Sequence, residues 1–353
     1  MAQPPGTDDA HRRLIATMPK AELHLHLDGS VRPETALELA SSRGVDAPRT
    51  LEGIRTMLVA PERCRDQAEL LRAFDLPIAL MQDAEALERI ASELVEDKAA
   101  DKVRYVEIRW GPLLHTARGL ALADGIGAVC RGARLAAART GIAVRLICTA
   151  LRSHDPDANV TLARTAAFFL DDGLTGFDLA GPEEAFPDPI VHAEAFAVAR
   201  AAGLRITLHA GEWGGAAQVR RALELAPERI AHGPGAVEDP TLVAELIARR
   251  VTLDLCPTSN VQAGIVPSVD VHPLARLHRA GVPVTLSTDD TTVSNITLSA
   301  EYQRAVERIG LSMSELWAIN RHALDVAFAD EATLAPIRGV FDAWASSEGA
   351  RYV

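Results

Sequence analysis

Short apolar runs rich in β-branched residues recur along the chain, and longer segments rich in Ala, Leu and Arg separate them. Short runs of this kind predict buried strands, whereas the longer segments carry helical periodicity. Strands that alternate with helices are typical of βαβ units in a parallel sheet. Eight such units favour an α/β fold that closes into a (β/α)8 TIM barrel over an open sheet. The predicted strands are Ala21–Asp28, Val103–Trp110, Ala143–Leu151, Leu174–Gly181, Arg205–Gly211, Arg229–Gly233, Val251–Pro257 and Val282–Asp290.

Helical periodicity is clearest between the predicted strands, and it continues after the last one. About 75 residues separate the first two predicted strands, far more than one crossover helix needs. Residues Arg32–Met81 are therefore expected to hold additional helices, which would form a lid at the C-terminal mouth of the barrel. No linker interrupts the pattern, so a single domain over residues 1–353 is expected. The predicted helices are Ala84–Ala100, Ile126–Thr140, Pro189–Ala202, Leu242–Arg250, Thr297–Gly310, Met313–Phe328 and Leu334–Ser346.

The composition narrows the classes of function. Of the 353 residues, 48% are hydrophobic and 24% are charged, as in ordinary globular proteins. The formal net charge of −12 argues against binding to a nucleic-acid backbone, but not against a nucleoside substrate. No apolar run is long enough to cross a membrane, and the polar N-terminus is unlike a secretion signal. We therefore expect a cytoplasmic enzyme. The cysteines, too scattered for a disulfide scaffold or a zinc module, are Cys64, Cys130, Cys148 and Cys256.

Histidines and aspartates gather at the ends of the predicted strands. His24 and His26 end the first strand, His209 ends the fifth, and Asp289 lies at the end of the eighth. The ends of parallel barrel strands converge on one face, where such enzymes carry their catalytic groups. Because strand residues alternate in direction, both imidazoles of the H-x-H pair project to the same side. Three imidazoles and a carboxylate form a nitrogen/oxygen site that suits Zn²⁺.

Three further residues lie beside these candidate ligands. Glu212 follows His209 by three residues and can serve as an acid/base next to a metal without binding it. His232, at the end of the sixth strand, could be a fourth ligand, a core histidine or an electrostatic partner of an attacking hydroxide, and we favour the last. Asp290 would point away from the site on an ideal strand, and it reaches the substrate only if the strand bends there.

The lysines bear on the number of metal ions. The only ones are Lys20, Lys98 and Lys102. Many binuclear barrel hydrolases bridge two metals with a carboxylated lysine at the end of the fourth strand, which here ends in Asp178–Gly181. The sequence therefore predicts one metal ion per chain.

Seven short motifs, in this order along nearly the whole chain, resemble the adenosine deaminase family of metal-dependent hydrolases. They are HLHLDGS (His24–Ser30), YVEIR (Tyr105–Arg109), DLAG (Asp178–Gly181), LHAGE (Leu208–Glu212), AHG (Ala231–Gly233), CPTSN (Cys256–Asn260) and STDD (Ser287–Asp290). The resemblance implies that zinc is bound by His24, His26, His209 and Asp289. It also implies that Glu212 protonates purine N1 while hydroxide adds at C6, and that His232 stabilises the hydroxide.

The resemblance also implies a set of substrate contacts. Asp290 would act in catalysis by accepting from the attacking water, and it would also hold N7. The Gly181 N–H would meet N3, and Asp28 would bind the ribose 5′-hydroxyl, with His26 beside the substrate. Because relatives that act on the free base tend to carry Glu at the position of Asp28, this favours adenosine or 2′-deoxyadenosine as the substrate.

Three departures from the family pattern, at Trp110, Pro182 and Thr291, leave the 5′ substituent open. The alternatives are a 5′-modified adenosine such as 6-aminodeoxyfutalosine and, less favoured, adenine. Two further alternatives do not involve deamination. The protein could be a mononuclear zinc amidohydrolase that opens a cyclic amide, or a barrel without catalytic activity that serves as a binding module. The oligomeric state stays open.

The remaining candidates are interpreted more simply. Leu70, Leu71 and Phe74 form one apolar helix face, which the resemblance places partly over the purine. Arg109 is expected to pair with a buried carboxylate, and His154 is expected in a loop. The histidines expected on helix or loop surfaces are His11, His115, His192, His272, His278 and His322.

Overall fold

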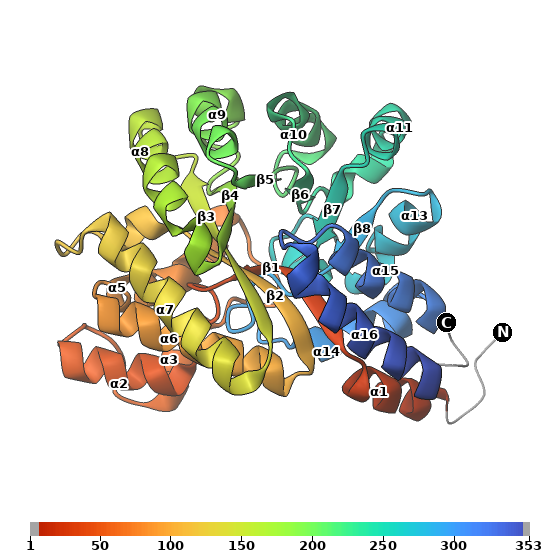
Figure 1. Cartoon of the computed structure of the whole chain (residues 1–353), viewed down its shortest axis with the longest axis horizontal. Coiled ribbons are helices and arrows are strands. Elements are labelled where there is room, and N and C mark those ends of the chain that lie inside the picture. Colours follow the sequence, from red (N-terminus) through yellow and green to blue (C-terminus); the bar gives the residue numbers. More distant parts are fainter. Residues whose placement is uncertain (1–6, 349–353) are drawn as a thin grey trace.

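The computed structural model describes residues 7–348 and contains eight parallel strands in sequence order (Figure 1). Strand β8 meets β1 through a bridge between Leu25 and Asp289, where the His26 N–H donates to the Asp289 carbonyl at 2.7 Å. This closure confirms the predicted (β/α)8 barrel. The strands are β1 (Lys20–His26), β2 (Val103–Trp110), β3 (Ala143–Leu151), β4 (Leu174–Ala180), β5 (Arg205–His209), β6 (Arg229–Ala231), β7 (Thr252–Leu255) and β8 (Val284–Leu286).

Helices between the strands form the outer layer of the barrel (Figure 1). Capping residues define where several of these helices begin and end. The Asp83 side chain accepts from the Ala86 N–H at the start of α6, and Gly141, with φ 74°, ends α7. The helices of this layer are α6 (Ala84–Ala100), α7 (Leu122–Thr140), α8 (Pro156–Ala166), α9 (Ala193–Ala201), α10 (Gly215–Ala222), α11 (Pro240–Arg249), α12 (Pro257–Gln262) and α13 (Leu274–Arg279).

The insertion after β1 is helical, as predicted. It consists of α2 (Pro33–Arg43), α3 (Leu51–Leu58), α4 (Gln67–Leu71), a 3-10 turn η1 (Arg72–Phe74) and α5 (Asp75–Leu80). Backbone bonds tie this insertion to the loops after β7 and β8, because the Cys64 N–H donates to the Gln262 carbonyl and the Ala60 N–H to the Val293 carbonyl. The insertion therefore lies at the mouth of the barrel.

The helices at the two ends of the chain lie at the opposite side of the barrel. Asn320 of α15 accepts from the Ala21 N–H at 3.0 Å and donates to the Pro19 carbonyl at 2.8 Å, which seals the start of β1. These contacts place α15 at the end of the barrel where β1 begins. The helices at the two ends of the chain are α1 (Thr7–Thr17), α14 (Leu298–Arg304) with a π turn (Ala305–Ile309), α15 (Met313–Asp325) and α16 (Glu331–Ser347).

Several predicted strands run one to four residues too far. Strand β6 ends at Ala231 because His232 adopts a left-handed backbone angle, φ 73°, and beyond β8 the chain makes the same kind of turn at Asp289, φ 67°. Such angles are uncommon for residues other than glycine, and they cluster at functional sites. The chain turns out of the sheet there, and the residues beyond the turn face the mouth.

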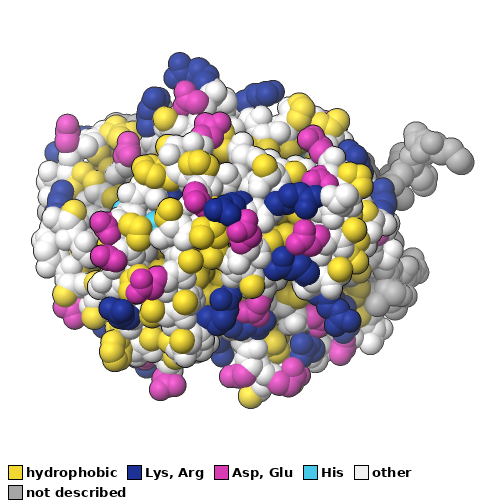
Figure 2. All heavy atoms as spheres, turned by 90° about the horizontal axis from the view of Figure 1, so that it is seen from above, with side chains coloured by type: hydrophobic (Ala, Val, Ile, Leu, Met, Phe, Trp, Pro, Cys, Tyr) yellow, Lys and Arg dark blue, Asp and Glu magenta, His cyan; other side chains and the backbone are white. Residues whose placement is uncertain are grey.

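No helix among the described residues is long and apolar enough to cross a membrane. On the face shown in Figure 2, Lys and Arg side chains are interspersed with Asp and Glu. That face offers no large single-sign patch.

Candidate functional site

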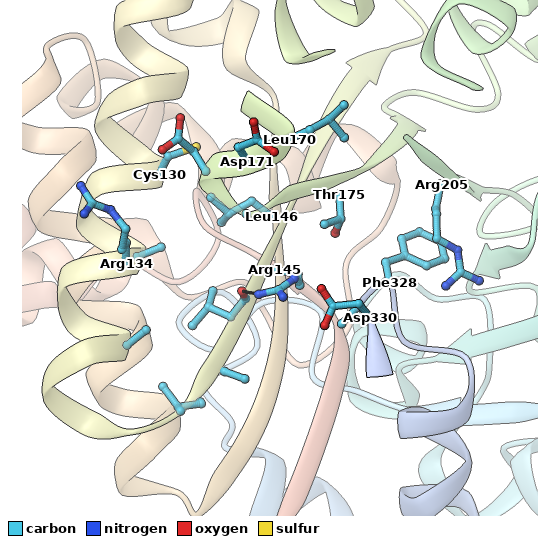
Figure 3. A pocket seen from close by; sticks show the side chains of 18 of the residues that line it. Cys130, Arg134, Arg145, Leu146, Leu170, Asp171, Thr175, Arg205, Phe328 and Asp330 are labelled. Carbon is cyan, nitrogen blue, oxygen red and sulfur yellow. Dashed lines mark hydrogen bonds between the residues drawn. The ribbon is translucent and has the colours of Figure 1, made fainter. Parts of the chain in front are cut away.

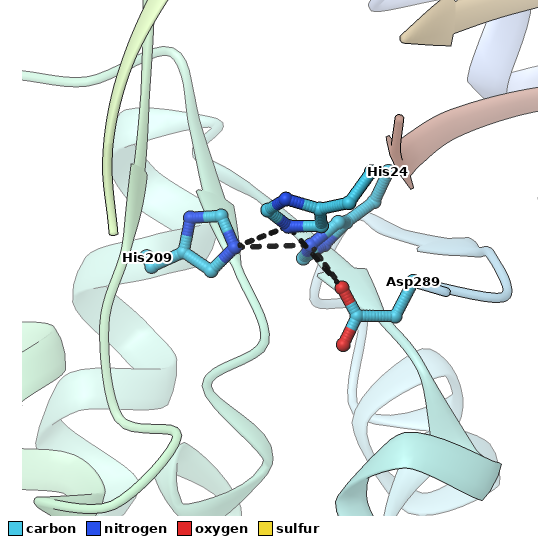
Figure 4. Close-up of side chains that lie close together, drawn as sticks. His24, His209 and Asp289 are labelled. Carbon is cyan, nitrogen blue, oxygen red and sulfur yellow. Dashed lines mark hydrogen bonds and ion pairs between the residues drawn. The ribbon is translucent and has the colours of Figure 1, made fainter. Parts of the chain in front are cut away.

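Four candidate ligands meet at the mouth of the barrel. One ligand atom from each of His24, His26, His209 and Asp289 lies within 4.8 Å of the others. The His209 Nε2 is 3.1 Å from Nε2 of both His24 and His26, and the Asp289 Oδ1 is 2.9 Å from the His24 Nε2 (Figure 4). Strands β1 and β5 and the turn after β8 supply these side chains.

This arrangement fits a metal cation. Burial lowers the pKa of His24 well below its ordinary value and the pKa of His26 to about 3, so both rings are neutral. Three ring nitrogens that point at one another need a shared cation or proton to relieve the repulsion of their lone pairs. Imidazoles with a carboxylate are a ligand set of mononuclear zinc sites.

Two residues outside the cluster orient its members. The buried Asp178 lies 3.0 Å from the His209 Nδ1, and Arg109 lies 3.3 Å from the same carboxylate. The Ser259 hydroxyl donates to the Asp289 Oδ2 at 2.7 Å. A carboxylate on the far nitrogen of a ligand histidine fixes its ring and increases its basicity. The expected pairing of Arg109 with a buried carboxylate is confirmed.

Glu212 and His232 lie beside the cluster. The His232 Nε2 is 3.8 Å from the Glu212 Oε1 and 3.7 Å from the Asp289 Oδ2. Burial, together with the charge of Asp289, raises the pKa of Glu212 to about 8. Glu212 can therefore carry a proton at neutral pH in this environment.

A buried carboxylate holds the loop that carries Glu212. Glu183 accepts backbone hydrogen bonds from Gly211 at 2.8 Å, Trp213 at 2.7 Å and Gly214 at 2.9 Å. Arg152 lies 3.6 Å from the same carboxylate and donates to the His209 carbonyl at 2.9 Å. The backbone on both sides of Glu212 is thus fixed.

Two more carboxylates point into the mouth, and the Asp28 Oδ1 lies 3.8 Å from the His26 Nδ1. Asp28 and Asp290 are both buried, and one oxygen of each has no hydrogen-bond partner among the described residues. Burial raises the pKa of Asp28 to about 6 and the pKa of Asp290 well above its ordinary value. Gly29 makes room for them, because a Cβ there would lie 1.6 Å from the Asp290 Oδ1. The positive φ of Asp289 turns Asp290 inward, as the bend considered from the sequence requires.

These groups line a cavity of about 370 Å³. Gly181 and Pro182 form part of one wall, and Leu70, Leu71 and Phe74 of the insertion face them. Five carboxylates line this cavity, but no lysine or arginine does: Asp28, Asp75, Glu212, Asp289 and Asp290. The cavity is therefore suited to an uncharged or cationic compound.

A larger cavity, of about 670 Å³, lies at the starts of β3, β4 and β5 and contains none of the predicted site residues (Figure 3). Its arginines are mostly engaged, since Arg205 bonds Glu228 and Arg145 donates to Thr333 at 2.5 Å. Arg205 also stacks on Phe328, at 4.6 Å from the ring centroid. The candidate metal ligands and the mouth carboxylates lie at the other end of the strands.

Some expectations from the sequence were wrong or incomplete. His115, His192 and His272 are buried, not on the surface, and the last two bond buried asparagines. A histidine on a helix or loop gives no sequence signal that separates the two cases. Asp178 and Glu183 lie in or next to the DLAG motif but were not assigned roles, because a supporting carboxylate has no spacing signature of its own.

Comparisons with known proteins identify the family of this chain. The adenosine deaminase family model matches residues 19–344. An adenosine deaminase from Vibrio vulnificus is 40% identical over 318 residues, which cover 89% of this chain and 96% of that relative. The solved structure of a zinc-bound amidohydrolase from Burkholderia ambifaria has a TM-score of 0.87 at 29% identity. The superposition covers 99% of this chain and 96% of the amidohydrolase chain.

Two other solved structures show how substrates vary among similar proteins. An N6-methyl-AMP deaminase from Arabidopsis thaliana has a TM-score of 0.83 at 31% identity, with 94% of this chain and 98% of that chain covered. An adenine deaminase from Arthrobacter aurescens has a TM-score of 0.86 at 28% identity, with 94% and 100% covered. The match to the family model and to the Vibrio relative shows that this chain belongs to the adenosine deaminase family and is an enzyme that acts as a deaminase on a purine ring.

Proposed function

We propose that this enzyme is a zinc-dependent hydrolase that converts adenosine or 2′-deoxyadenosine to inosine or 2′-deoxyinosine and ammonia. The observation that carries the proposal is the convergence of ligand atoms from three imidazoles and Asp289 within 4.8 Å, beside a cavity that His26, His209 and Glu212 line. His24, His26, His209 and Asp289 would hold one zinc ion per chain. A zinc ion at such a site lowers the pKa of water so that it attacks at neutral pH.

Glu212 is proposed as the proton carrier. In its acid form it donates a proton to N1, which makes C6 more electrophilic. Its carboxylate then takes the proton of the hydroxyl group added at C6 and passes it to the departing amino group, so that C6 becomes a carbonyl and ammonia leaves. A dication at the cluster would lower the pKa of Glu212 again, and burial provides the opposing bias toward the acid form.

The substrate contacts follow from the unpartnered groups of the mouth. The free oxygen of Asp28 needs a hydrogen-bond donor, which a ribose hydroxyl provides at the sugar end of the cavity, whereas the donors of free adenine, N9–H and the 6-amino group, lie on the ring itself. The Gly181 N–H is proposed to meet N3, and Asp290 to hold N7 beside His26. Because no lysine or arginine lines the cavity, a 5′-phosphate would find no counter-charge, so the nucleoside is favoured over its nucleotide.

A 5′-modified adenosine is the second candidate. The observation that favours it is that Pro182, one of the departures from the family pattern, and Gly111, next to another, line the cavity. Trp110 and Thr291 do not line it. A larger 5′ substituent would therefore be accommodated along the Pro182 wall.

The test is the change in ultraviolet absorbance on deamination, measured with adenosine, 2′-deoxyadenosine, adenine, AMP and a 5′-extended adenosine. We expect adenosine to exceed adenine by at least ~10-fold in kcat/KM, because ~1.4 kcal/mol at Asp28 corresponds to that factor. Ammonia release with metal analysis, showing one zinc per chain, accompanies the assay. Two zinc ions that are both needed for turnover, or a preference for adenine or AMP, would contradict the proposal.

A further inference from the structure

We infer that a relay of hydrogen bonds from Leu274 through His272 and Asn260 fixes His232 as the neutral tautomer with its proton on Nε2. His232 then presents an N–H to the reaction cavity and acts as a donor, not as a base. The inference rests on the proposed function, because it assigns the direction of one hydrogen bond in the same site.

The relay begins at a backbone group. The Leu274 N–H donates to the His272 Nδ1 at 3.2 Å, and a backbone N–H can only donate. The His272 Nδ1 therefore has no proton. Burial lowers the pKa of His272 to about 3, so the ring is neutral and its proton is on Nε2. That Nε2 lies 3.1 Å from the Asn260 side chain, so the atom facing it must be the amide oxygen.

Asn260 transmits this direction to His232. With its oxygen turned to His272, its amide nitrogen faces the His232 Nδ1 at 3.0 Å. The amide nitrogen also can only donate, so the His232 Nδ1 accepts and the proton is on Nε2. Turning the amide around would leave the His272 and Asn260 donors face to face in a buried site, at the expense of both hydrogen bonds.

The same relay disfavours a charged His232. An imidazolium would carry a proton on Nδ1, directly opposite the donating amide of Asn260. On the cavity side, Nε2 is 3.8 Å from the Glu212 Oε1 and 3.7 Å from the Asp289 Oδ2, so its proton is not used by either carboxylate. An oxygen that attacks the purine ring between these groups would accept this hydrogen bond. Since the Nε2 lone pair is absent, His232 cannot take a proton from that oxygen, and proton transfer falls to carboxylates that line the cavity, Glu212 and Asp290.

Neither member of the relay touches the substrate. Asn260 ends the CPTSN segment and is fully buried on α12, and His272 precedes α13, so both are positioning residues. The chain offers a matched control on the other side of the barrel. The Asn159 Nδ2 faces the Nδ1 of buried His192 at 3.1 Å, and neither residue lines the cavity.

The direct test is nitrogen-15 NMR of the zinc-loaded, full-length enzyme with labelled histidine, because the ring nitrogens of the two tautomers have different shifts. His232→Gln and His272→Gln identify the two signals. We expect both histidines to be neutral with a protonated Nε2 at pH 7 to 8. A proton on the His232 Nδ1, or on both of its nitrogens, would overturn the inference whatever the activity of the protein.

A variant then connects the tautomer to the reaction. Asn260→Asp replaces the donating amide with an acceptor, so the proton of His232 should move to Nδ1. The loss of one donor to a developing oxyanion predicts a fall in kcat of ~10²- to 10³-fold with little change in KM. Asn159→Asp should change the His192 signal and leave kcat unchanged. A shifted His232 proton with unchanged kcat would contradict its role as a donor, whereas wild-type enzyme inactive on every 6-aminopurine would contradict the proposed function alone.

Discussion

Two sets of buried charged side chains lie in the barrel, and they differ in how their charges are compensated. The central network consists of Glu107, Arg109, Asp178, Arg229 and Asp254. In it, Arg229 bonds Glu107 and lies 3.1 Å from Asp254, while Arg109 lies 3.3 Å from Asp178. The mouth carboxylates are Asp28, Glu212 and Asp290, and no lysine or arginine lines their cavity.

The pKa values follow this difference. Burial alone would raise the pKa of Asp178, but His209 and Arg109 outweigh it and hold the pKa well below its ordinary value. At the mouth, burial outweighs the backbone hydrogen bonds of Asp28 and the charge of His209 near Glu212, and it raises the pKa of Asp28 to about 6 and that of Glu212 to about 8. Buried acids without counter-charges reduce stability, and they are typical of sites that must move protons or bind polar substrates. The central network therefore supports the fold, and the mouth carboxylates are available for chemistry.

The largest effect is expected from the proposed ligands. His209→Ala should lose both the metal and turnover, because it removes one of four convergent donors. His232→Ala is the matched control: its ring centroid is only 5.3 Å from that of His209, but we place it outside the ligand set. Metal analysis and turnover of both variants check this. Metal loss in His232→Ala would make it a ligand.

The next largest effect concerns the central network. Arg229→Met should reduce the free energy of unfolding by about 3–5 kcal/mol, because it leaves Glu107 buried without its cation and leaves Asp254 with Arg109 alone, at 3.8 Å. It also removes the guanidinium that stacks 3.8 Å from the Phe328 ring centroid. Urea denaturation measures the change. A loss below about 1 kcal/mol would mean that the network does not stabilise the fold.

Asp178 belongs to the central network and also touches the site. Asp178→Asn should weaken metal binding by ~10- to 100-fold, since the carboxylate orients His209 and increases its basicity. Competition with a chelator measures the affinity. Unchanged affinity would show that His209 is positioned by the strand alone.

Asp28→Asn separates function from stability at the mouth. The preference for adenosine over adenine should shrink by ~10-fold, the equivalent of ~1.4 kcal/mol. The free energy of unfolding should stay the same or rise, because an uncompensated buried charge is removed. Paired kinetics and denaturation measure both quantities. If Asp28→Asn lost as much stability as Arg229→Met, the mouth carboxylates would support the fold in the same way as the central network, contrary to this account.

Glu301 offers a smaller test away from the mouth. It is buried, accepts from the Thr258 N–H at 2.7 Å, and burial raises its pKa to about 7. A pKa raised by folding contributes stability that is full below the unfolded pKa of about 4.5 and is lost as the pH rises through about 7. The stability of wild type relative to Glu301→Gln should therefore fall between pH 4.5 and 7. If the difference in the free energy of unfolding between wild type and Glu301→Gln did not change with pH, the raised pKa of Glu301 would be contradicted.

The sequence predicted the barrel because periodicity reports strands and helices directly. Residues Val103–Trp110, Ala143–Leu151 and Ala84–Ala100 form elements with the predicted bounds. The grouping of His24, His26, His209 and Asp289 was also predictable, since parallel strand ends converge. Their roles remain predictions.

What the sequence did not predict depends on contacts between distant segments. Asp178 on His209, Glu183 on the loop of Glu212, and Asn260 between two histidines each arise from three-dimensional packing. No local pattern distinguishes a buried His272 from one on the surface. The early ends of the strands at His232 and Asp289 likewise reflect backbone angles that are rare for these residue types.

The most direct test of the central claim combines three measurements on Glu212→Gln: turnover, zinc content and the free energy of unfolding. The carboxylate is held for proton transfer, so turnover should fall by ~10²- to 10⁴-fold or more. Zinc should be retained, and the free energy of unfolding should stay the same or rise. A variant that keeps more than about a tenth of wild-type turnover, or that loses stability as Arg229→Met does, would contradict the account.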